Sequence, residues 1–396
     1  MKISFLCSCI EPGRDGVGDY VRQFARTLAS RGYACQIVAL CDPYVSAPSG
    51  DSLQGSTVEI VRIPSTYWQA GDIGAADAAL RLFEPDWTSL QMVCYGYEPR
   101  GLLLWSGSRF ERLRPGRGRG HLMLHELWIG ESLDYGIKDR AVGWIQKQFL
   151  LRAFRAWAPE VTHTSNPTYR ELLLRNGIIA GELPLPGNIR IVPAKPGFAR
   201  RWVEQRAGLD AIAPDALFAG VFGAIHQHWA DFSWVGRLAQ ACDSAGRHLV
   251  VLQIGRKSEV GAEIWRALSG LRTRGVRFVE LGEMEEDGVS LALQAIDLGI
   301  ATSPWALVGK SGAVAAMLEH GLPVAVTTTE HRLRFGATPE PAPHARLYRF
   351  DDRFLARVAT GSLRRAEPCA DGGVYDRFLE SLSGSLDGVR DGVRAS

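Results

Sequence analysis

The stretch KISFLCSCIEPGRDGVG, residues 2–18, joins a short apolar run to a glycine-rich turn. The run over 2–10 is followed by proline and glycine, which predicts a short buried strand. Residues 19–30 carry apolar side chains at helical spacing, and ACQIVALC at 34–41 predicts a second strand. A strand, a glycine-rich loop, a helix and a second strand form the basic unit of parallel α/β sheets.

The same alternation continues along both halves of the chain. In the first half we expect strands at 57–63, 87–94, 121–127 and 160–164 and helices at 74–84, 138–158 and 167–176. In the second half we expect strands at 216–223, 248–254, 276–281, 297–302 and 322–327 and helices at 231–245, 258–273, 287–296 and 311–320. This alternation predicts two α/β domains with Rossmann-like, doubly wound parallel sheets.

The boundary between the domains is expected in LPLPGNIRIVPAKPG, residues 183–197, which contains four prolines and two glycines. This linker would join a first domain over 1–182 to a second domain over 198–372. The tail, 373–396, contains one more amphipathic helix, expected at 373–383, which could pack back on the first domain. Two such domains would face a cleft, and ligands of such sheets bind at the carboxyl ends of the strands.

The composition excludes several classes of protein. The 396 residues include 45 Lys and Arg against 43 Asp and Glu, so the formal net charge is +2. A dedicated nucleic-acid binder carries a clearly basic domain, so we expect no nucleic-acid partner. No apolar run reaches the ~18 residues of a membrane span. The seven cysteines lack zinc-binding spacing, so we interpret them as reduced thiols of a cytoplasmic protein without a bound metal.

The glycine-rich loop before the first helix is a candidate anion site. A loop that opens a helix presents free N–H groups and the positive end of the helix dipole, which suit a phosphate. We therefore expect Gly16, Val17 and Gly18 to contact such a group. The dinucleotide fingerprint would need a further glycine at position 21, which is Val21. A flexible connection without a ligand is the alternative.

The segment PWALVGKSG, residues 304–312, follows an expected strand and opens an expected helix. Its end resembles a Walker A loop, although that motif needs glycine where residue 304 is proline. A lysine at a helix N-terminus is unfavourable for the helix itself, so an anionic ligand is one reason for Lys310 to be there. We expect a donor-binding group of Trp305, Lys310, Ser311 and Gly312, with Ser311 as the helix cap.

Two further loops of the second domain follow expected strands. Gly223 and His226 come after the first strand, and we expect them to contact a ligand through hydrogen bonds. Arg256 and Lys257 come after the next strand, where two cations would balance a diphosphate. Ordinary solvated loops are the alternative in both places.

In the first domain, His125 and Glu126 stand at the end of the strand expected at 121–127. A titratable pair at the carboxyl end of a strand suits acid–base chemistry or recognition of a hydroxyl group. A surface turn without a function is the alternative.

Two other stretches are candidates for contact with a membrane or with an anionic acceptor. RFERLRPGRGRG, residues 109–120, carries five arginines and is expected to be a flexible basic loop. Contact with an anionic acceptor or with a membrane, as a peripheral protein, is the alternative. In the helix around 146–157, a single apolar face is formed by Phe149, Leu150, Ala153, Phe154 and Trp157. Such a stripe is more typical of core packing than of a membrane anchor.

Several stretches together resemble the GT-B glycosyltransferases of family 4. They are MKISF at 1–5, GVGDYV at 16–21, ASRGY at 29–33, VRFVELG at 276–282, AIDLGI at 295–300 and MLEHGLPVAV at 317–326. The resemblance implies a nucleoside-diphosphate sugar as donor, an acceptor hydroxyl, retention of configuration, and no metal or other cofactor. It also implies a sugar contact near His125, and we expect His125, Glu126 and Asp19 to act at the sugar and the acceptor.

The sequence departs from the family pattern in the donor loop, which often reads Glu-x7-Glu and here lacks the first glutamate. Ala224 and Trp229 stand about where the family has an arginine and a lysine. Three other functions therefore stay open. They are a nucleotide-sugar epimerase or hydrolase on the same fold, a nucleotide-sugar-binding protein that has lost catalysis, and a dinucleotide oxidoreductase suggested by Gly16, Gly18 and Asp42.

Overall fold

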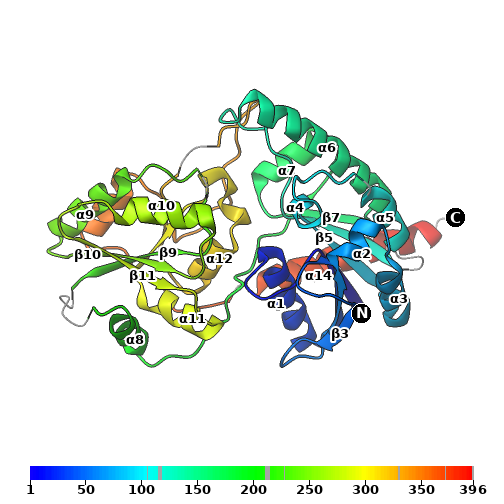
Figure 1. Ribbon diagram of the computed structural model, residues 1–396, viewed down its shortest axis with the longest axis horizontal. Helices are drawn as coiled ribbons and strands as arrows, with labels where there is room; N and C mark the ends of the chain where they lie inside the picture. The colour runs from blue at the N-terminus through cyan, green and yellow to red at the C-terminus, as the bar shows by residue number, and fades with distance from the viewer. Residues whose placement is uncertain are drawn as a thin grey trace. The chain divides into compact units, whose positions relative to one another are not determined.

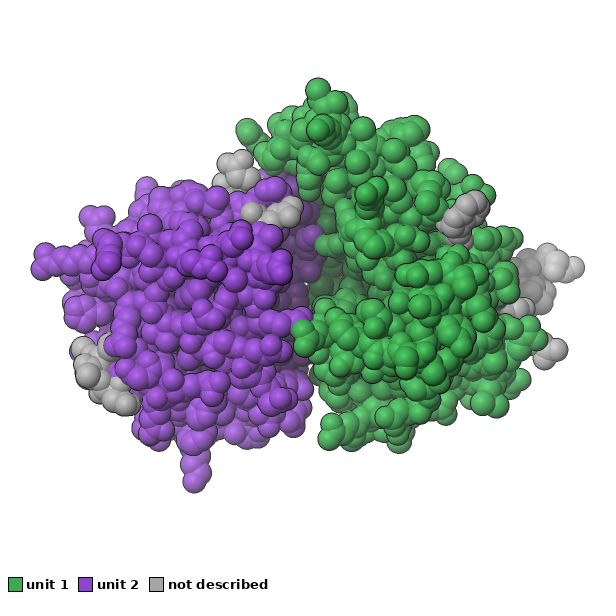
Figure 2. All heavy atoms as spheres, in the orientation of Figure 1, with its two compact units in different colours: residues 1–185, 332–339, 372–396 green, residues 186–331, 340–371 purple. Residues whose placement is uncertain are grey.

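The computed structural model describes residues 1–104, 106–114, 118–209, 215–226, 228–328, 331–370 and 372–394, without the side chains of 385–394. The chain divides into two compact units (Figure 2). Unit 1 comprises residues 1–185, 332–339 and 372–396, and unit 2 comprises residues 186–331 and 340–371. Each unit is an α/β domain built on one sheet, as the sequence predicts.

Unit 1 contains an eight-stranded sheet that is parallel except for its edge strand β3 (Figure 1). Its strands, in spatial order, are β3 (Ser49–Ser52), β4 (Glu59–Pro64), β2 (Ala34–Asp42), β1 (Lys2–Cys7), β5 (Trp87–Met92), β6 (Arg119–Leu124), β7 (Val161–Thr164) and β8 (Gly181–Glu182). Its helices are α1 (Gly16–Ser30), α2 (Ser65–Ala70), α3 (Gly74–Phe83), α4 (Cys94–Tyr97), α5 (Ser106–Leu113), α6 (Ile137–Trp157), α7 (Pro167–Leu174) and α14 (Gly373–Arg394).

Helices from the two ends of the sequence share the main core of unit 1. Phe5 of β1 lies 6.0 Å, between ring centroids, from Phe24 of α1, which lies 5.1 Å from Phe378 of α14. All three side chains are almost fully buried. Burying a side chain of this size contributes about 1.5–3 kcal/mol. The C-terminal helix is therefore part of the first unit's core, and it is longer than the 373–383 expected from the sequence.

Unit 2 contains a six-stranded, fully parallel sheet. Its strands, in spatial order, are β11 (Val276–Gly282), β10 (Leu249–Ile254), β9 (Leu217–Phe222), β12 (Leu298–Ala301), β13 (Val324–Val326) and β14 (Leu347–Arg349). Its helices are α8 (Phe198–Arg206), α9 (Ser233–Ser244), α10 (Glu259–Ser269), α11 (Glu286–Ala295), α12 (Gly312–Glu319), α13 (Asp352–Ala359) and the 3₁₀ helix η1 (Trp305–Lys310).

Alternate side chains along the strands of unit 2 enter two separate cores. On β10, Leu249 and Val251 pack with residues of α9, α10 and α13, whereas Val250 and Leu252 pack with residues of α8, α11 and α12. Successive side chains of a strand point to opposite faces, so this alternation places helices on both faces of the sheet. The sheet is therefore doubly wound.

The division into units differs from the expected domain boundaries in one strap of chain, residues 332–339. Ser132 and Leu333 form an antiparallel bridge, the N–H of Leu133 donates to the carbonyl of Arg332, and the N–H of Arg334 donates to the carbonyl of Glu131. These backbone contacts join segments far apart in the sequence, which no local pattern reveals. The expected linker is also divided, with 183–185 in unit 1 and 186–197 in unit 2.

The expectation of a flexible basic loop over 109–120 is wrong for its described residues. Arg109 lies within α5 and is buried, with its guanidinium 5.1 Å from the ring centre of Trp68. Phe110 and Leu113 fix the same helix by packing into the core, and β6 begins at Arg119. The remaining residues, 115–117, lie outside the described residues.

Among the described residues, no helix is long and apolar enough to cross a membrane.

Candidate functional site

In each unit one predicted glycine-containing loop follows the strand at which the strand order reverses, residues 16–18 after β1 and Gly223 after β9. In unit 1 the chain builds outward from β1 to β2 and then returns to β5, on the other side of β1. In unit 2 it builds from β9 to β10 and β11 and then returns to β12, on the other side of β9. Ligands of such sheets bind at this switch point, outside the carboxyl ends of the strands.

The N-terminus of α1 in unit 1 is already occupied by a carboxylate. Asp15 is the N-cap residue, and its side chain accepts from the N–H of Val17 at 3.1 Å and from the N–H of Gly18. Burial raises the pKa of Asp15. The Asp19 carboxylate accepts from the N–H of Gly13 at 3.0 Å. The N–H groups of Val17 and Gly18 are therefore engaged, which counts against the predicted phosphate contact at this loop.

Gly18 has a packing reason to be glycine. A Cβ at this position would lie 2.4 Å from the carbonyl oxygen of Cys9 and 2.9 Å from the Cα of Ile10. The first turn of α1 thus passes directly over the chain that leaves β1. A Cβ at Gly16 would meet nothing within 4 Å, so the two glycines of the motif have different roles.

His125 follows β6 and ends a row of buried polar side chains that crosses three strands. The Nε2 atom of His125 lies 2.8 Å from Oε1 of Gln91, and Nε2 of Gln91 lies 2.6 Å from Oγ of Ser89. The row continues from Ser89 Oγ to Nδ1 of His121 at 2.6 Å, and from Nε2 of His121 to Nδ1 of His163 at 3.0 Å. These four partners are not predicted from the sequence, where their signal is the presence of polar residues at core positions of apolar strands.

The Gln91 amide determines which nitrogen of His125 carries the proton. An amide oxygen only accepts, so Nε2 of His125 is the protonated nitrogen. Ser89 accepts from the Gln91 amide N–H, and the tautomers of His121 and His163 set the direction of the remaining hydrogen bonds of the row. His125 is thus a neutral imidazole whose Nδ1 has a lone pair for a hydrogen-bond donor.

Burial keeps all three histidines of the row neutral. It lowers the pKa of His125 to about 3 and that of His163 to about 4. Burial and the neighbouring His163 also lower the pKa of His121 well below its usual value. The ring of Tyr20 packs edge-on against His125, with 4.8 Å between the ring centres. A neutral, held imidazole suits recognition of a hydroxyl group better than proton transfer near neutral pH.

Glu126, the residue after His125, lies near the buried Cys94. It is half-buried, and its charge raises the pKa of the buried Cys94 thiol, after the larger effect of burial itself. Asp19 lies on the first turn of α1. The predicted trio of His125, Glu126 and Asp19 thus belongs to one unit, and of the three only His125 belongs to the polar row.

In unit 2, two predicted site elements meet at the switch point. A Cβ on Gly223, which directly follows β9 and has a φ of 75°, would lie 3.3 Å from the Cβ of Ala313 in the first turn of α12. A Cβ on Gly255, which follows β10, would lie 3.9 Å from the nitrogen of Gly223. The loop after β9 therefore approaches the first turn of α12 closely, and the loop after β10 lies beside Gly223 and the Phe222 ring.

Ser311 caps α12, as the sequence predicts. Its side chain accepts from the N–H of Val314 at 3.3 Å. Lys310 is the last residue of η1, directly before this cap, and is half-buried. Gly312 begins the helix, and a Cβ there would lie 3.8 Å from the Asn188 side chain. The helix end therefore presents backbone N–H groups of its first turn beside a lysine, the arrangement expected for an anion site.

Lys257 does not supply a free cation to this region. Its Nζ atom forms an ion pair with Glu280 and lies 3.2 Å from Oε1 of Gln253. This ion pair counts against the predicted contact of Lys257 with a diphosphate, because its charge is already neutralised. Arg256, in the same loop, is half-buried.

The last two predicted donor residues lie in the loops after β12 and β9. The indole N–H of Trp305 donates to Glu340 at 2.6 Å, and Arg349 lies over the Trp305 ring at 4.4 Å. The backbone N–H of His226 donates to Oγ1 of Thr302 at 3.1 Å, which joins the loops after β9 and β12. Trp305 is thus held in an ion-pair cluster, while His226 lies at the switch point.

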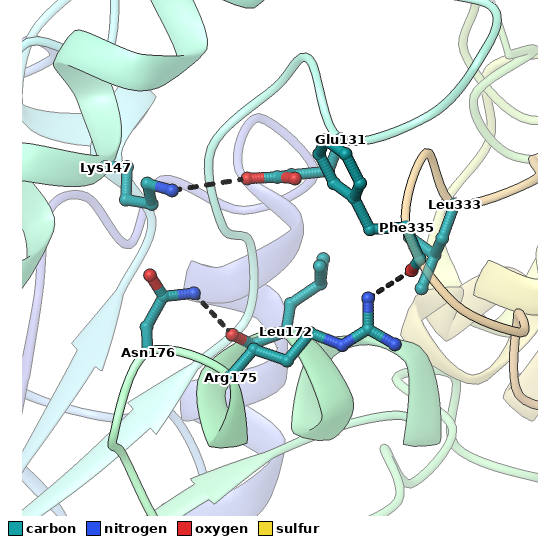
Figure 3. A pocket seen from close by; sticks show the side chains of 7 residues that line it. All are labelled: Glu131, Lys147, Leu172, Arg175, Asn176, Leu333 and Phe335. Carbon is teal, nitrogen blue, oxygen red and sulfur yellow. Dashed lines mark hydrogen bonds and ion pairs between the residues drawn. The ribbon is translucent and has the colours of Figure 1, made fainter.

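A separate pocket lies in unit 1, beneath the 332–339 strap (Figure 3). Its volume is about 180 Å³, and it is lined by Glu131, Lys147, Leu172, Arg175, Asn176, Leu333 and Phe335. Lys147 lies 3.7 Å from Glu131, and Arg175 donates to the carbonyl of Phe335 (Figure 3). Ligand pockets usually enclose roughly 300–1,000 Å³, so this one is too small for a nucleotide sugar.

Within the described ranges, no group of three or more His, Cys, Asp or Glu side chains could hold a metal ion.

Neither a comparison with models of protein families nor one with curated protein sequences gives a match. Solved structures do match over the whole chain. The protein Alr3699/HepE from Anabaena, solved in complex with UDP, is 14% identical with a TM-score of 0.53, covering 97% of this chain and 100% of that chain. A UDP-forming α,α-trehalose-phosphate synthase from Burkholderia xenovorans is 12% identical with a TM-score of 0.51, covering 100% and 98%.

A third match is a putative UDP-N-acetylglucosamine 2-epimerase from Listeria monocytogenes, at 11% identity and a TM-score of 0.50, covering 98% of both chains. Identities this low carry information on the fold and not on the reaction. Together with the two doubly wound units and the switch-point loops described above, these matches show that the chain has the GT-B fold of two Rossmann-like domains.

Proposed function

We propose that this protein is a glycosyltransferase that moves a sugar from a nucleoside-diphosphate sugar to an acceptor hydroxyl, with retention of configuration and without a metal. The proposal is supported by the fold, which it shares with a UDP-forming synthase and with a protein solved in complex with UDP. Retention and metal independence follow from the family resemblance of the sequence.

The close approach of Gly223 to the first turn of α12 is the single observation that carries the proposal. A leaving diphosphate develops negative charge, and preorganised N–H donors stabilise that charge most effectively. The first turn of α12 offers such donors, Lys310 adds a positive charge, and Gly223 places a loop without a side chain beside that turn. Unit 2 would therefore hold the nucleoside diphosphate.

In unit 1, His125 would bind a hydroxyl group of the substrate. Its Nδ1 lone pair accepts a hydrogen bond, whereas a phosphate oxygen offers it no proton near neutral pH. Glu126 and Asp19 remain candidates for the acceptor hydroxyl. Asp15 at the start of α1 would repel an anion there, so the diphosphate contacts belong to unit 2 and not to the glycine-rich loop.

Calorimetric titration with UDP, GDP and ADP tests the nucleotide site. Ala313→Leu fills the space beside Gly223 and is expected to weaken nucleotide binding by ~10-fold or more, since ligand contacts at a helix N-terminus need close approach. Ala356→Leu, at an exposed position of α13, is the matched control and should bind normally. If Ala313→Leu and the unchanged protein bind the nucleotide equally well, the nucleotide site does not lie at the start of α12.

A nucleotide-sugar 2-epimerase is the second candidate, favoured by the likeness to the Listeria protein. Product analysis with the donor alone distinguishes the two reactions. A transferase leaves most of the donor intact until an acceptor is added, whereas an epimerase converts it without an acceptor. A protein that binds nucleotide sugars but converts none, with or without acceptors, would be a binding protein that has lost catalysis.

A further inference from the structure

Helix α6 carries apolar side chains on two opposite faces. Its inner face, with Leu150, Ala153 and Trp157 buried, is the stripe that the sequence analysis assigned to the core. On the outer side, Ile137 is 83% exposed and Trp144 is 61% exposed. These two residues are seven apart, close to two helical turns, so they share one face. Both side chains lie on the side of α6 that faces away from its buried residues.

Exposed apolar residues are concentrated at this place. The described residues include fifteen large apolar side chains that are exposed, and five of them lie within 133–145. They are Leu133, Ile137, Val142, Trp144 and Ile145. Single exposed apolar residues are ordinary on a protein surface, whereas a group on one face marks a site of contact. We call Ile137, Trp144 and Ile145 the outer apolar face of α6.

Cations without partners extend the same face. Arg152 follows Ile145 by seven residues and Arg155 follows Trp144 by eleven, so both continue the outer face along the helix. Lys138 precedes Ile145 by seven residues. All three are exposed, and none forms an ion pair among the residues that the structure describes.

Some arginines of other helices have a carboxylate partner four residues away. Arg81 pairs with Asp77 on α3, Arg175 pairs with Glu171 at the end of α7, and Arg200 pairs with Glu204 on α8. α6 contains a single acidic residue, Asp139, against five basic ones. The outer face of α6 is therefore apolar and positively charged at once, with its charges available to an external anionic partner.

We propose that the outer face of α6 binds an anionic lipid surface, with Trp144 and its apolar neighbours entering the headgroup region and Lys138, Arg152 and Arg155 pairing with lipid phosphates. A helix lying in the membrane interface buries an apolar face among the headgroups and attracts anionic lipids through Lys and Arg. A Trp ring suits that region because it has a large apolar body and one polar N–H.

Charge favours a lipid surface over a second copy of the chain. In a twofold dimer the same patch meets itself, so two positively charged faces would oppose one another without carboxylates to pair them. An anionic bilayer neutralises every one of these charges. This inference is independent of the proposed reaction, since it uses no residue of the candidate site.

Sedimentation of the full-length protein with vesicles tests the proposal. Vesicles of phosphatidylcholine alone are compared with vesicles that also contain phosphatidylglycerol. We expect binding to the mixed vesicles, weakened by salt, and little binding to phosphatidylcholine alone. Trp144→Glu should lower binding by ~10-fold or more, and Arg152→Gln or Arg155→Gln by about fivefold each.

Matched controls separate this face from general surface effects. Ile179→Glu changes an apolar residue that is 86% exposed beyond α7, and Arg81→Gln removes an arginine that is paired on α3. Both should bind vesicles as the unchanged protein does. The proposal is overturned if the unchanged protein ignores anionic vesicles, or if Trp144→Glu and Ile179→Glu bind equally. It is also overturned if the unchanged protein forms a dimer in gel filtration, Trp144→Glu dissociates that dimer, and neither protein binds vesicles.

Discussion

The Nε2 atom of His125 lies 2.8 Å from the Oε1 atom of Gln91, at the carboxyl ends of the neighbouring strands β6 and β5. This contact decides which nitrogen of His125 carries the proton and leaves Nδ1 as an acceptor. Gln91 thus acts as a positioning residue for a predicted site residue, and it is held in turn by Ser89.

Replacing Gln91 tests this arrangement. Gln91→Leu should allow both tautomers of His125 and, by removing the hydrogen bonds of Gln91 to His125 and to Ser89, lower the free energy of unfolding by about 1–3 kcal/mol. Gln91→Glu is the control, because its carboxylate still accepts from Nε2. The ¹⁵N shifts of the imidazole report the tautomer directly. Persistence of a pure Nε2–H tautomer in Gln91→Leu would mean that Gln91 does not set it.

The buried histidines predict how stability depends on pH. An unfolded histidine binds a proton near pH 6.5, whereas His163 and His125 in the folded protein stay neutral down to about 4 and about 3. The unfolded state therefore binds more protons between these values, so stability is complete above pH 6.5 and falls with decreasing pH. Each histidine contributes a slope of about 1.4 kcal/mol per pH unit in that window.

Urea unfolding at several pH values measures this slope. His163→Gln, which keeps a hydrogen-bonding side chain without titrating in this range, should flatten the curve below pH 6. An identical slope in His163→Gln and the unchanged protein would contradict the assignment of the pH dependence to this row.

Lys310 is the charged residue expected to matter most at the nucleotide site. Lys310→Ala should lower turnover by ~100-fold or more, the scale of a lost transition-state contact to a developing charge. Lys195→Ala removes an exposed lysine elsewhere in unit 2 and serves as the control. Initial rates with a saturating donor give the comparison, and near-normal turnover in Lys310→Ala would exclude the role.

Replacing the two glycines of this motif by alanine should change the stability of the protein by different amounts. Gly18→Ala places a Cβ 2.4 Å from the carbonyl oxygen of Cys9, so overpacking should lower the free energy of unfolding by about 1–3 kcal/mol. Gly16→Ala has open space and should change it by no more than about 0.5 kcal/mol. Chemical denaturation of both variants makes the comparison, and equal losses would refute the packing explanation.

Local patterns were sufficient for most of the regular elements. The apolar runs predict the strands from β1 to β13 except the short strands β3 and β8, and Ser311 is recognisable as a helix cap from its position alone. Arg109 shows where such reasoning stops. Its neighbours in sequence are basic and glycine-rich, which suggests a loop, whereas its burial against Trp68 depends on a helix from another part of the chain.

By itself, the sequence determined the fold class of this protein, because strand and helix periods and turn residues are local properties of the chain. It also determined that glycine-rich and polar loops follow the strands. Tertiary structure decided which of those loops remain available to a ligand. Asp15 occupies the start of α1 and Glu280 neutralises Lys257. The partners of His125 and the outer face of α6 were likewise decided by packing, since each depends on segments that meet only in the folded chain.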